Sequence, residues 1–256
     1  MQLSCTKHFR FALILLFSTL MTSLSVQSAT RPATEDALDA MESSFVIEVT
    51  ETPGFIRFDN RFSNKTVGLL IEPGGEVDPV AYARIARKIA GAGYPVVIDK
   101  TPSELVIAGV MPSMVGVVKQ SNPDITAWAL AGHSLGGVIA GRYIAQNPAD
   151  ISVKGLALWA SFPDPNMPIS YRTDLIVASI YGEMDCLVPK EDVLGLAWTL
   201  PFTATIVQMD GANHAQWGDY GPQEGDCEAE ITPTQQKIRG KRSTIELVLS
   251  QIESSQ

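Results

Sequence analysis

Short apolar runs alternate with amphipathic segments along most of this 256-residue chain, and this alternation limits the possible folds more than any other feature. The apolar runs have the length and composition of buried strands, and the amphipathic segments have helical spacing. The expected strands span residues 45–50, 54–59, 66–73, 94–99, 125–132, 153–160, 174–182 and 203–210. The expected helices span residues 78–93, 111–123, 134–148 and 189–200, and a last one begins at residue 232.

This order of elements predicts the class of fold. The first two expected strands are separated by the turn sequence ETPG and should form a hairpin. The later strands mostly alternate with helices, which predicts parallel strands joined by right-handed crossovers, with helices on both faces of the sheet. We therefore expect an α/β domain over residues 45–256 with an eight-stranded, mostly parallel sheet. Ligands bind such sheets at the carboxyl ends of the strands, so polar residues that follow strands are candidates for a site.

The segment GHSLGG places Ser134 between an expected strand and an expected helix. It matches G-x-S-x-G, in which the serine lies on a sharp turn and the helix N-terminus offers free N–H groups to an oxyanion. Gly132, Gly136 and Gly137 allow the strained backbone and the close packing of helix on strand that this turn needs. A plain turn serine is the alternative, but the position between strand and helix favours a nucleophile.

A serine hydroxyl needs a general base, and the chain has three histidines. His8 lies in the N-terminal leader described below. His133 is adjacent to Ser134, and neighbouring side chains in such a turn diverge. His214, directly after the last expected strand, is therefore the candidate base, although a solvated loop histidine would look the same in the sequence.

The base in turn needs a carboxylate to orient it. Asp185, in the sequence IYGEMDCLVP after the preceding strand, is the candidate acid. Glu183 and Asp210 are its rivals. Glu183 lies two residues nearer to its strand, and Asp210 lies too close to a strand end to face His214 easily.

Two backbone N–H groups should stabilise an oxyanion. One is expected from Leu135, the residue after the candidate nucleophile. The other should come from the loop EPGGEVD after the third strand, where we favour Gly75 over its neighbours Gly74 and Glu76. The alternative is that the two glycines only turn the chain.

The N-terminus resembles a secretory leader. Residues 1–28 contain a basic start, a ten-residue apolar run and a short polar segment of small residues. The apolar run is shorter than the roughly 20 residues of a membrane span, so a signal peptide is favoured over a membrane anchor. Residues 29–44 are polar and predict an N-terminal tail. We expect a secreted or periplasmic protein without stable membrane insertion.

The charge of the chain argues against some partners. The net charge of −9 becomes −11 when residues 1–28, which hold two cations and no anion, are removed. A surface of this charge repels nucleic acid and anionic membranes. The sequence also lacks a metal-ligand cluster, a phosphate loop and a nucleotide fingerprint, so we expect no metal and no cofactor.

Cys186 and Cys227 are the cysteines that remain once the leader with Cys5 is removed. An even number of cysteines in an exported protein permits one disulfide. Cys186 follows the candidate acid, and Cys227 lies in the loop beyond the candidate base. Because the strands before these loops should be neighbours, we predict a bridge that joins the two loops. Two unpaired thiols are the alternative.

At this point the chain resembles the α/β-hydrolase superfamily over nearly all of the segment after the leader. The order Ser, Asp, His is the order of the catalytic residues in that superfamily. The segments PGGEVDPVAYARIARKIAGAGYPVVI, AGHSLGG and GANHAQWGDYG resemble, more narrowly, a family of small bacterial hydrolases called α/β-hydrolase fold-5. The resemblance implies a triad of Ser134, Asp185 and His214 and little about the substrate. The sequence departs from that family at Cys186 and Cys227, where the family tends to have glycine.

Many hydrolases of this fold insert a helical lid between the sixth and seventh strands. Here that interval, SFPDPNMPISYRT, has three prolines and no helical period, so we expect a minimal lid and an open site. Trp217, Tyr220 and Met167 are candidates for substrate contact, although packing is the commoner role of such residues.

The sequence as a whole predicts a serine hydrolase that works through an acyl-enzyme, a carboxylesterase acting on a small-molecule ester. Acyl transfer or peptidase activity on the same triad, and a non-catalytic binding protein on this fold, are the alternatives. The sequence does not determine the oligomeric state.

Overall fold

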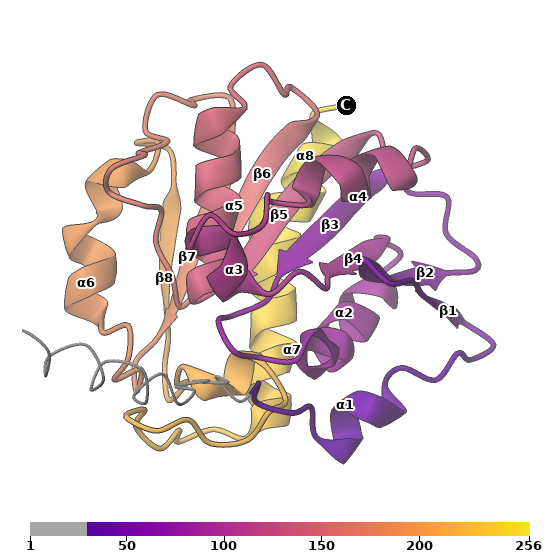
Figure 1. Ribbon diagram of the computed structural model, residues 1–256, viewed down its shortest axis with the longest axis horizontal. Coiled ribbons are helices and arrows are strands. Elements are labelled where there is room, and N and C mark those ends of the chain that lie inside the picture. Colours follow the sequence, from indigo (N-terminus) through magenta and orange to yellow (C-terminus); the bar gives the residue numbers. More distant parts are fainter. Residues whose placement is uncertain (1–29) are drawn as a thin grey trace, which may run out of the picture.

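The computed structural model describes residues 30–256, so the leader expected over residues 1–28 lies outside the described residues and stays a prediction. An eight-stranded sheet runs through the molecule in the order β1-β2-β4-β3-β5-β6-β7-β8 (Figure 1). Its strands are β1 (Ile47–Glu51), β2 (Phe55–Asn60), β3 (Val67–Glu72), β4 (Val96–Asp99), β5 (Ala127–His133), β6 (Val153–Trp159), β7 (Ile176–Gly182) and β8 (Thr205–Met209). β2 is antiparallel to both β1 and β4, and all other pairs are parallel. The expected hairpin and the eight-stranded, mostly parallel sheet are confirmed.

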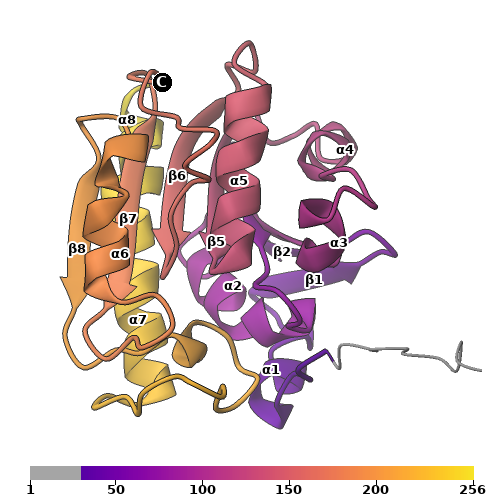
Figure 2. The ribbon, with the colours of Figure 1, turned by 60° about the vertical axis from the view of Figure 1, so that its left-hand side comes forward.

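Helices cover both faces of this sheet, as expected (Figures 1 and 2). Because side chains of a strand alternate between faces, Leu69 and Ile71 of β3 face one layer and Leu70 faces the other. The first layer is formed mainly by α2 (Ala83–Ala90), α7 (Pro233–Thr244) and α8 (Ser250–Ser254), and the second by α4 (Val115–Ser121) and α5 (Leu135–Gln146). The helices are α1 (Glu35–Asp39), η1 (Pro79–Tyr82), α2 (Ala83–Ala90), α3 (Ser103–Ile107), α4 (Val115–Ser121), α5 (Leu135–Gln146), α6 (Lys190–Gly195), η2 (Ala197–Thr199), η3 (Ala215–Trp217), α7 (Pro233–Thr244), η4 (Ile245–Leu249) and α8 (Ser250–Ser254).

The N-terminal segment differs from the tail that its polar sequence predicted. It contains α1, and Ala37 of this helix is fully buried. Thr34 N–H donates to the carbonyl of Asp219 at 2.8 Å, and Arg31 forms a β-bridge with Val77 beside the loop after β3. The segment is therefore part of the folded domain, with Ala37 and Ala40 buried although Leu38 is about half exposed.

The chain between β6 and β7 contains no helix or strand, which agrees with the expected absence of a helical lid. The short helix α3, which the sequence did not predict, follows β4 and packs against α5. The C-terminal helix begins as expected, with Thr232 as N-cap in a capping box and Pro233 in the first turn. Among residues 30–256, no helix is both long and apolar enough to cross a bilayer.

Candidate active site

Ser134 lies at the sharp turn between β5 and α5, with φ of 52° and ψ of −122°. Such a positive φ is rare for a residue with a side chain and marks a strained turn. The surrounding glycines explain how the turn is tolerated. A Cβ atom on Gly132 would collide with the backbone of Gly137, and one on Gly136 would collide with the carbonyl of Glu72. The strand and the helix can therefore approach closely enough to hold Ser134 in this conformation.

Asp185 and His214 meet at the carboxyl ends of β7 and β8. The Nδ1 atom of His214 lies 2.9 Å from Oδ2 of Asp185, and both side chains are buried. The other carboxylate oxygen accepts the N–H groups of Leu187 at 3.0 Å and Val188 at 2.7 Å. In the tautomer that carries its proton on Nδ1, His214 donates to Asp185 and leaves Nε2 able to accept a proton.

The rival carboxylates are engaged elsewhere. Glu183 accepts the N–H of Gly211 at 3.0 Å, and Asp210 accepts the side-chain amide of Gln208 at 3.1 Å. Asp185 is thus the carboxylate that orients His214 in this structure.

The ring of His214 packs against the ring of His133, the residue before Ser134, with centroids 4.6 Å apart. This contact brings His214, the candidate base, to the end of β5 next to Ser134, the candidate nucleophile. Within the described residues, no hydrogen bond joins Ser134 Oγ to His214. Catalytic hydrogen bonds of this kind often form fully only when substrate binds.

Tyr82 links the turn at Ser134 to the loop after β3, a contact that the sequence did not predict. Its hydroxyl accepts the N–H of Gly74 at 2.9 Å and lies 2.8 Å from Nδ1 of His133. Burial, with a further contribution from His214, lowers the pKa of His133 well below its usual range, so its ring is neutral. Burial also raises the pKa of Tyr82, which keeps its hydroxyl protonated and able to donate to Nδ1. The only sequence signal was the place of Tyr82 on the buried side of the expected helix.

The loop after β3 lies over the first turn of α5. The loop carries Gly75 and the helix turn carries Leu135, the two expected oxyanion donors. Gly74 N–H is bound to Tyr82, and Glu76 N–H donates to the carboxylate of Glu104 at 3.2 Å. Of these three consecutive N–H groups, that of Gly75 has no partner among the described residues. A Cβ atom on Gly75 would lie 3.0 Å from the side chain of Leu135. Leu135 is the first residue of α5, so its N–H has no partner within the helix. The geometry favours the pair Leu135 and Gly75.

Two of the three candidates for substrate contact are placed differently from the prediction. Trp217 is fully buried and stacks on Trp159, with centroids 5.3 Å apart and planes 4° from parallel, so it belongs to the core. The sulfur of Met167 contacts the amide of Gln146 at the C-terminal end of α5, while Ser134 precedes the N-terminal end of this 12-residue helix. At a rise of 1.5 Å per residue these ends are about 18 Å apart.

Tyr220 is closer to the site but is mostly buried. Its ring lies 6.4 Å from that of His133, centroid to centroid, and its hydroxyl donates to Gln223 at 3.0 Å. Its role in substrate contact stays a prediction.

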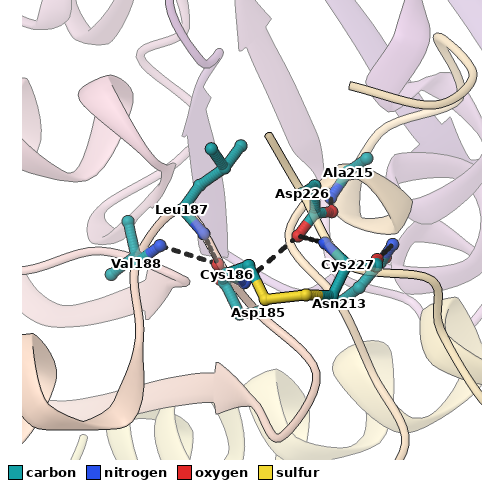
Figure 3. Close-up of a disulfide and its surroundings, with 8 residues drawn as sticks. All are labelled: Asp185, Cys186, Leu187, Val188, Asn213, Ala215, Asp226 and Cys227. Atoms are coloured by element: carbon teal, nitrogen blue, oxygen red, sulfur yellow. Dashed lines mark hydrogen bonds between the residues drawn. A yellow bond between two sulfur atoms is a disulfide. The ribbon is translucent and has the colours of Figure 1, made fainter. Parts of the chain in front are cut away.

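The expected disulfide between Cys186 and Cys227 is present, with Cα atoms 5.3 Å apart (Figure 3). As predicted, β7 and β8 are neighbours in the sheet. The bridge joins the loop that carries Asp185 to the segment that follows the loop of His214.

Comparison with known proteins identifies the protein family of the chain. The sequence profile of the alpha/beta hydrolase family matches residues 68–238, which is more than half of the chain. The protein belongs to the α/β-hydrolase family. A search of curated proteins finds no significant match to the sequence.

Solved structures agree with this fold. A candidate dienelactone hydrolase from Klebsiella pneumoniae is 17% identical, with a TM-score of 0.55 over 80% of this chain and 98% of that chain. A predicted CIB-like hydrolase from Thermoplasma acidophilum is 15% identical, with a TM-score of 0.52 over 78% of this chain and 98% of that chain. At this identity the similarity shows a shared fold.

Proposed function

We propose that the protein is an exported serine hydrolase that cleaves small carboxylic esters through an acyl-enzyme. Membership of the α/β-hydrolase family supports hydrolase activity in general. The observation that carries the finer assignment is the hydrogen bond between His214 and Asp185, beside a serine held in the strained turn that begins α5.

In the first half of the proposed reaction, Ser134 Oγ attacks the ester carbonyl and transfers its proton to Nε2 of His214. The N–H groups of Leu135 and Gly75 stabilise the oxyanion that forms. Collapse of this intermediate breaks the bond to the alcohol, which leaves with the proton from His214. Asp185 holds the imidazole in the required tautomer and stabilises the imidazolium.

In the second half, water attacks the acyl-serine and His214 again accepts and returns the proton. The acid leaves and Ser134 regains its hydroxyl hydrogen. The interval between β6 and β7 contributes no helical lid, which supports a substrate with short groups rather than one that a lid must enclose.

Export is supported by two independent features. Residues 1–28 have the pattern of a signal peptide, and the disulfide between Cys186 and Cys227 is of a kind that persists in oxidising compartments.

Labelling with a fluorophosphonate and hydrolysis of p-nitrophenyl esters of increasing chain length test the proposed function. Wild-type protein should be labelled and should cleave the short esters. Ser134→Ala should abolish labelling and lower kcat by about two to six orders of magnitude, with unchanged circular dichroism. Retention of more than about a tenth of the wild-type kcat would remove Ser134 from the mechanism.

The same assay separates the alternatives. An acyltransferase would give mostly transfer product when an alcohol or amine is added, and a peptidase would cleave p-nitroanilides as well as esters. A binding protein on this fold would show neither labelling nor turnover.

A further inference from the structure

Asp226 places its carboxylate between the loop of the candidate acid and the loop of the candidate base (Figure 3). One oxygen, Oδ1, accepts the N–H of Cys186 at 3.3 Å and the N–H of Cys227 at 2.9 Å. The other, Oδ2, accepts the N–H of Ala215 at 2.8 Å. Three backbone donors from three segments therefore converge on one carboxylate.

The positions of two of these donors matter most. Cys186 directly follows Asp185, and Ala215 directly follows His214. A displacement of either backbone would move the acid or the base with it. Asp226 thus couples the two loops at the points where a displacement would change the 2.9 Å contact between Asp185 and His214.

The disulfide by itself does not make this connection. It attaches Cys186 of the acid loop to Cys227, but neither cysteine belongs to the base loop. Residues 226–227 are attached to the base loop by Asp226 Oδ2 and by the side-chain amide of Asn213, which donates to the carbonyl of Cys227 at 2.8 Å. The covalent bridge therefore does not contact the base loop directly, and these two hydrogen bonds connect it to Asn213 and Ala215 on either side of His214.

The chemistry of the contact requires a carboxylate. Both oxygens of an ionised carboxylate accept hydrogen bonds, and bonds from N–H groups to a charged acceptor are about twice as strong as neutral ones. An asparagine in the same place would keep one accepting oxygen and would point an NH₂ group at an N–H donor.

We propose that Asp226 is a positioning residue of the active site, which fixes the acid and base loops relative to each other. The proposal rests on the proposed serine-hydrolase function. Asp226 bonds to backbone N–H groups of both loops and acts on the reaction through Asp185 and His214.

The test compares Asp226→Asn with Glu224→Gln. Glu224 is exposed on the same loop, so its substitution removes the same charge without touching the three hydrogen bonds. Misplacement of catalytic groups by about 1 Å costs on the order of 100-fold in rate. For Asp226→Asn we expect kcat on p-nitrophenyl acetate to fall by about 10- to 100-fold, with KM changed less than about twofold. Glu224→Gln should match the wild type in both constants, and Asp226→Glu should recover part of the lost kcat.

A spectroscopic readout tests the contact between the loops directly. The proton on His214 Nδ1, shared with Asp185, should give a downfield proton resonance in the wild type, identified by its loss in His214→Ala. In Asp226→Asn this resonance should move upfield or broaden, while in Glu224→Gln it should stay in place. A wild-type kcat together with an unchanged resonance in Asp226→Asn would overturn the proposal, as would equal losses of kcat in the two variants.

Two further measurements keep the outcome clear. If Asp226→Asn fails to fold, hydrogen exchange of the Ala215 amide in the wild type decides: slow exchange supports the contact, and exchange at the rate of an unstructured amide overturns it. If the wild type neither reacts with fluorophosphonate nor cleaves esters, the proposed function fails, whereas the His214 resonance still reports on Asp226.

Discussion

Glu72 is a buried acidic residue at the end of β3, whose backbone carbonyl lies against Gly136 in the turn that follows Ser134. It is 1% exposed at the end of β3, and its Oε1 atom has no hydrogen-bond partner among the described residues. Asp99 ends the neighbouring strand β4 and is equally buried. Burial, with a further contribution from Asp99, raises the pKa of Glu72 well above its usual range. The folded protein therefore holds a proton on Glu72 at pH values where the unfolded chain has lost it.

This raised pKa predicts a pH-dependent effect of Glu72→Gln, which keeps the shape of the side chain and removes its titration. Between the ordinary pKa of about 4.3 and the raised folded value, the wild type loses stability as the pH rises, because its folded state binds more protons than its unfolded state. The variant lacks this loss. The difference in free energy of unfolding, variant minus wild type, should therefore increase as the pH rises through that range.

Urea unfolding of both proteins between pH 4 and pH 8 measures this difference. The two proteins should differ least at the acid end of the series. A difference that is constant across the series would show that Glu72 titrates in the folded protein as it does in the unfolded chain.

At the scale of elements, the unit formed by β5, the turn at Ser134 and α5 depends on close backbone packing. A Cβ atom on Gly136 would overlap the carbonyl oxygens of Glu72 and Pro73, which belong to the backbone and cannot rotate away. Any side chain there would push the start of α5 away from β3. The N–H of Leu135 would move with it, away from the loop that carries Gly75.

We therefore expect Gly136→Ala to lower both stability and activity. Overpacking of this kind costs on the order of 1–3 kcal/mol, so the midpoint of urea unfolding should fall and kcat should fall with it. Gly116 in α4 provides the matched control, because a Cβ atom there would meet only the hydroxyl of Tyr143, at 3.9 Å. Gly116→Ala should be neutral or stabilising by up to about 1 kcal/mol. Equal effects of the two substitutions would contradict this account of the turn.

At the scale of the whole molecule, the disulfide acts largely on the unfolded chain. Cys186 and Cys227 are 41 residues apart in the sequence. Closing a loop of that length reduces the entropy of the unfolded chain by an amount worth about 4 kcal/mol in the chain-entropy model. In the folded protein the same bridge ties the loop of Asp185 to residues 226–227, which hydrogen bonds attach to the loop of His214.

Reduction of the bridge should lower the free energy of unfolding by about 3–5 kcal/mol. The urea m-value should rise, because the reduced chain exposes more surface when it unfolds. Activity should fall together with stability. The double variant Cys186→Ser and Cys227→Ser should behave like the reduced wild type and should not respond to reductant. A reductant-insensitive wild type with two titratable thiols after denaturation would show that the bridge is absent.

The sequence by itself determined the sheet, the hairpin and the turn at Ser134, because each depends on local patterns. Strands and helices follow from the period of apolar residues, and the turn follows from glycines bracketing a serine. The sequence also predicted that Asp185 and His214, and the two cysteines, would lie close together. That prediction rests on a general property of parallel sheets, whose carboxyl strand ends share one edge.

Only the tertiary structure decided which side chains meet between segments far apart in the chain. It placed Trp217 in a stack with Trp159, Met167 at the far end of α5, and Tyr82 between the nucleophile turn and the loop after β3. It also showed Asp226 bound to the loops that carry Asp185 and His214. These contacts depend on the directions in which loops leave the sheet. They also depend on the space that the packed sheet and helices leave for the loop side chains. The spacing of apolar residues records that a side chain is buried, but it does not record which partner it will meet.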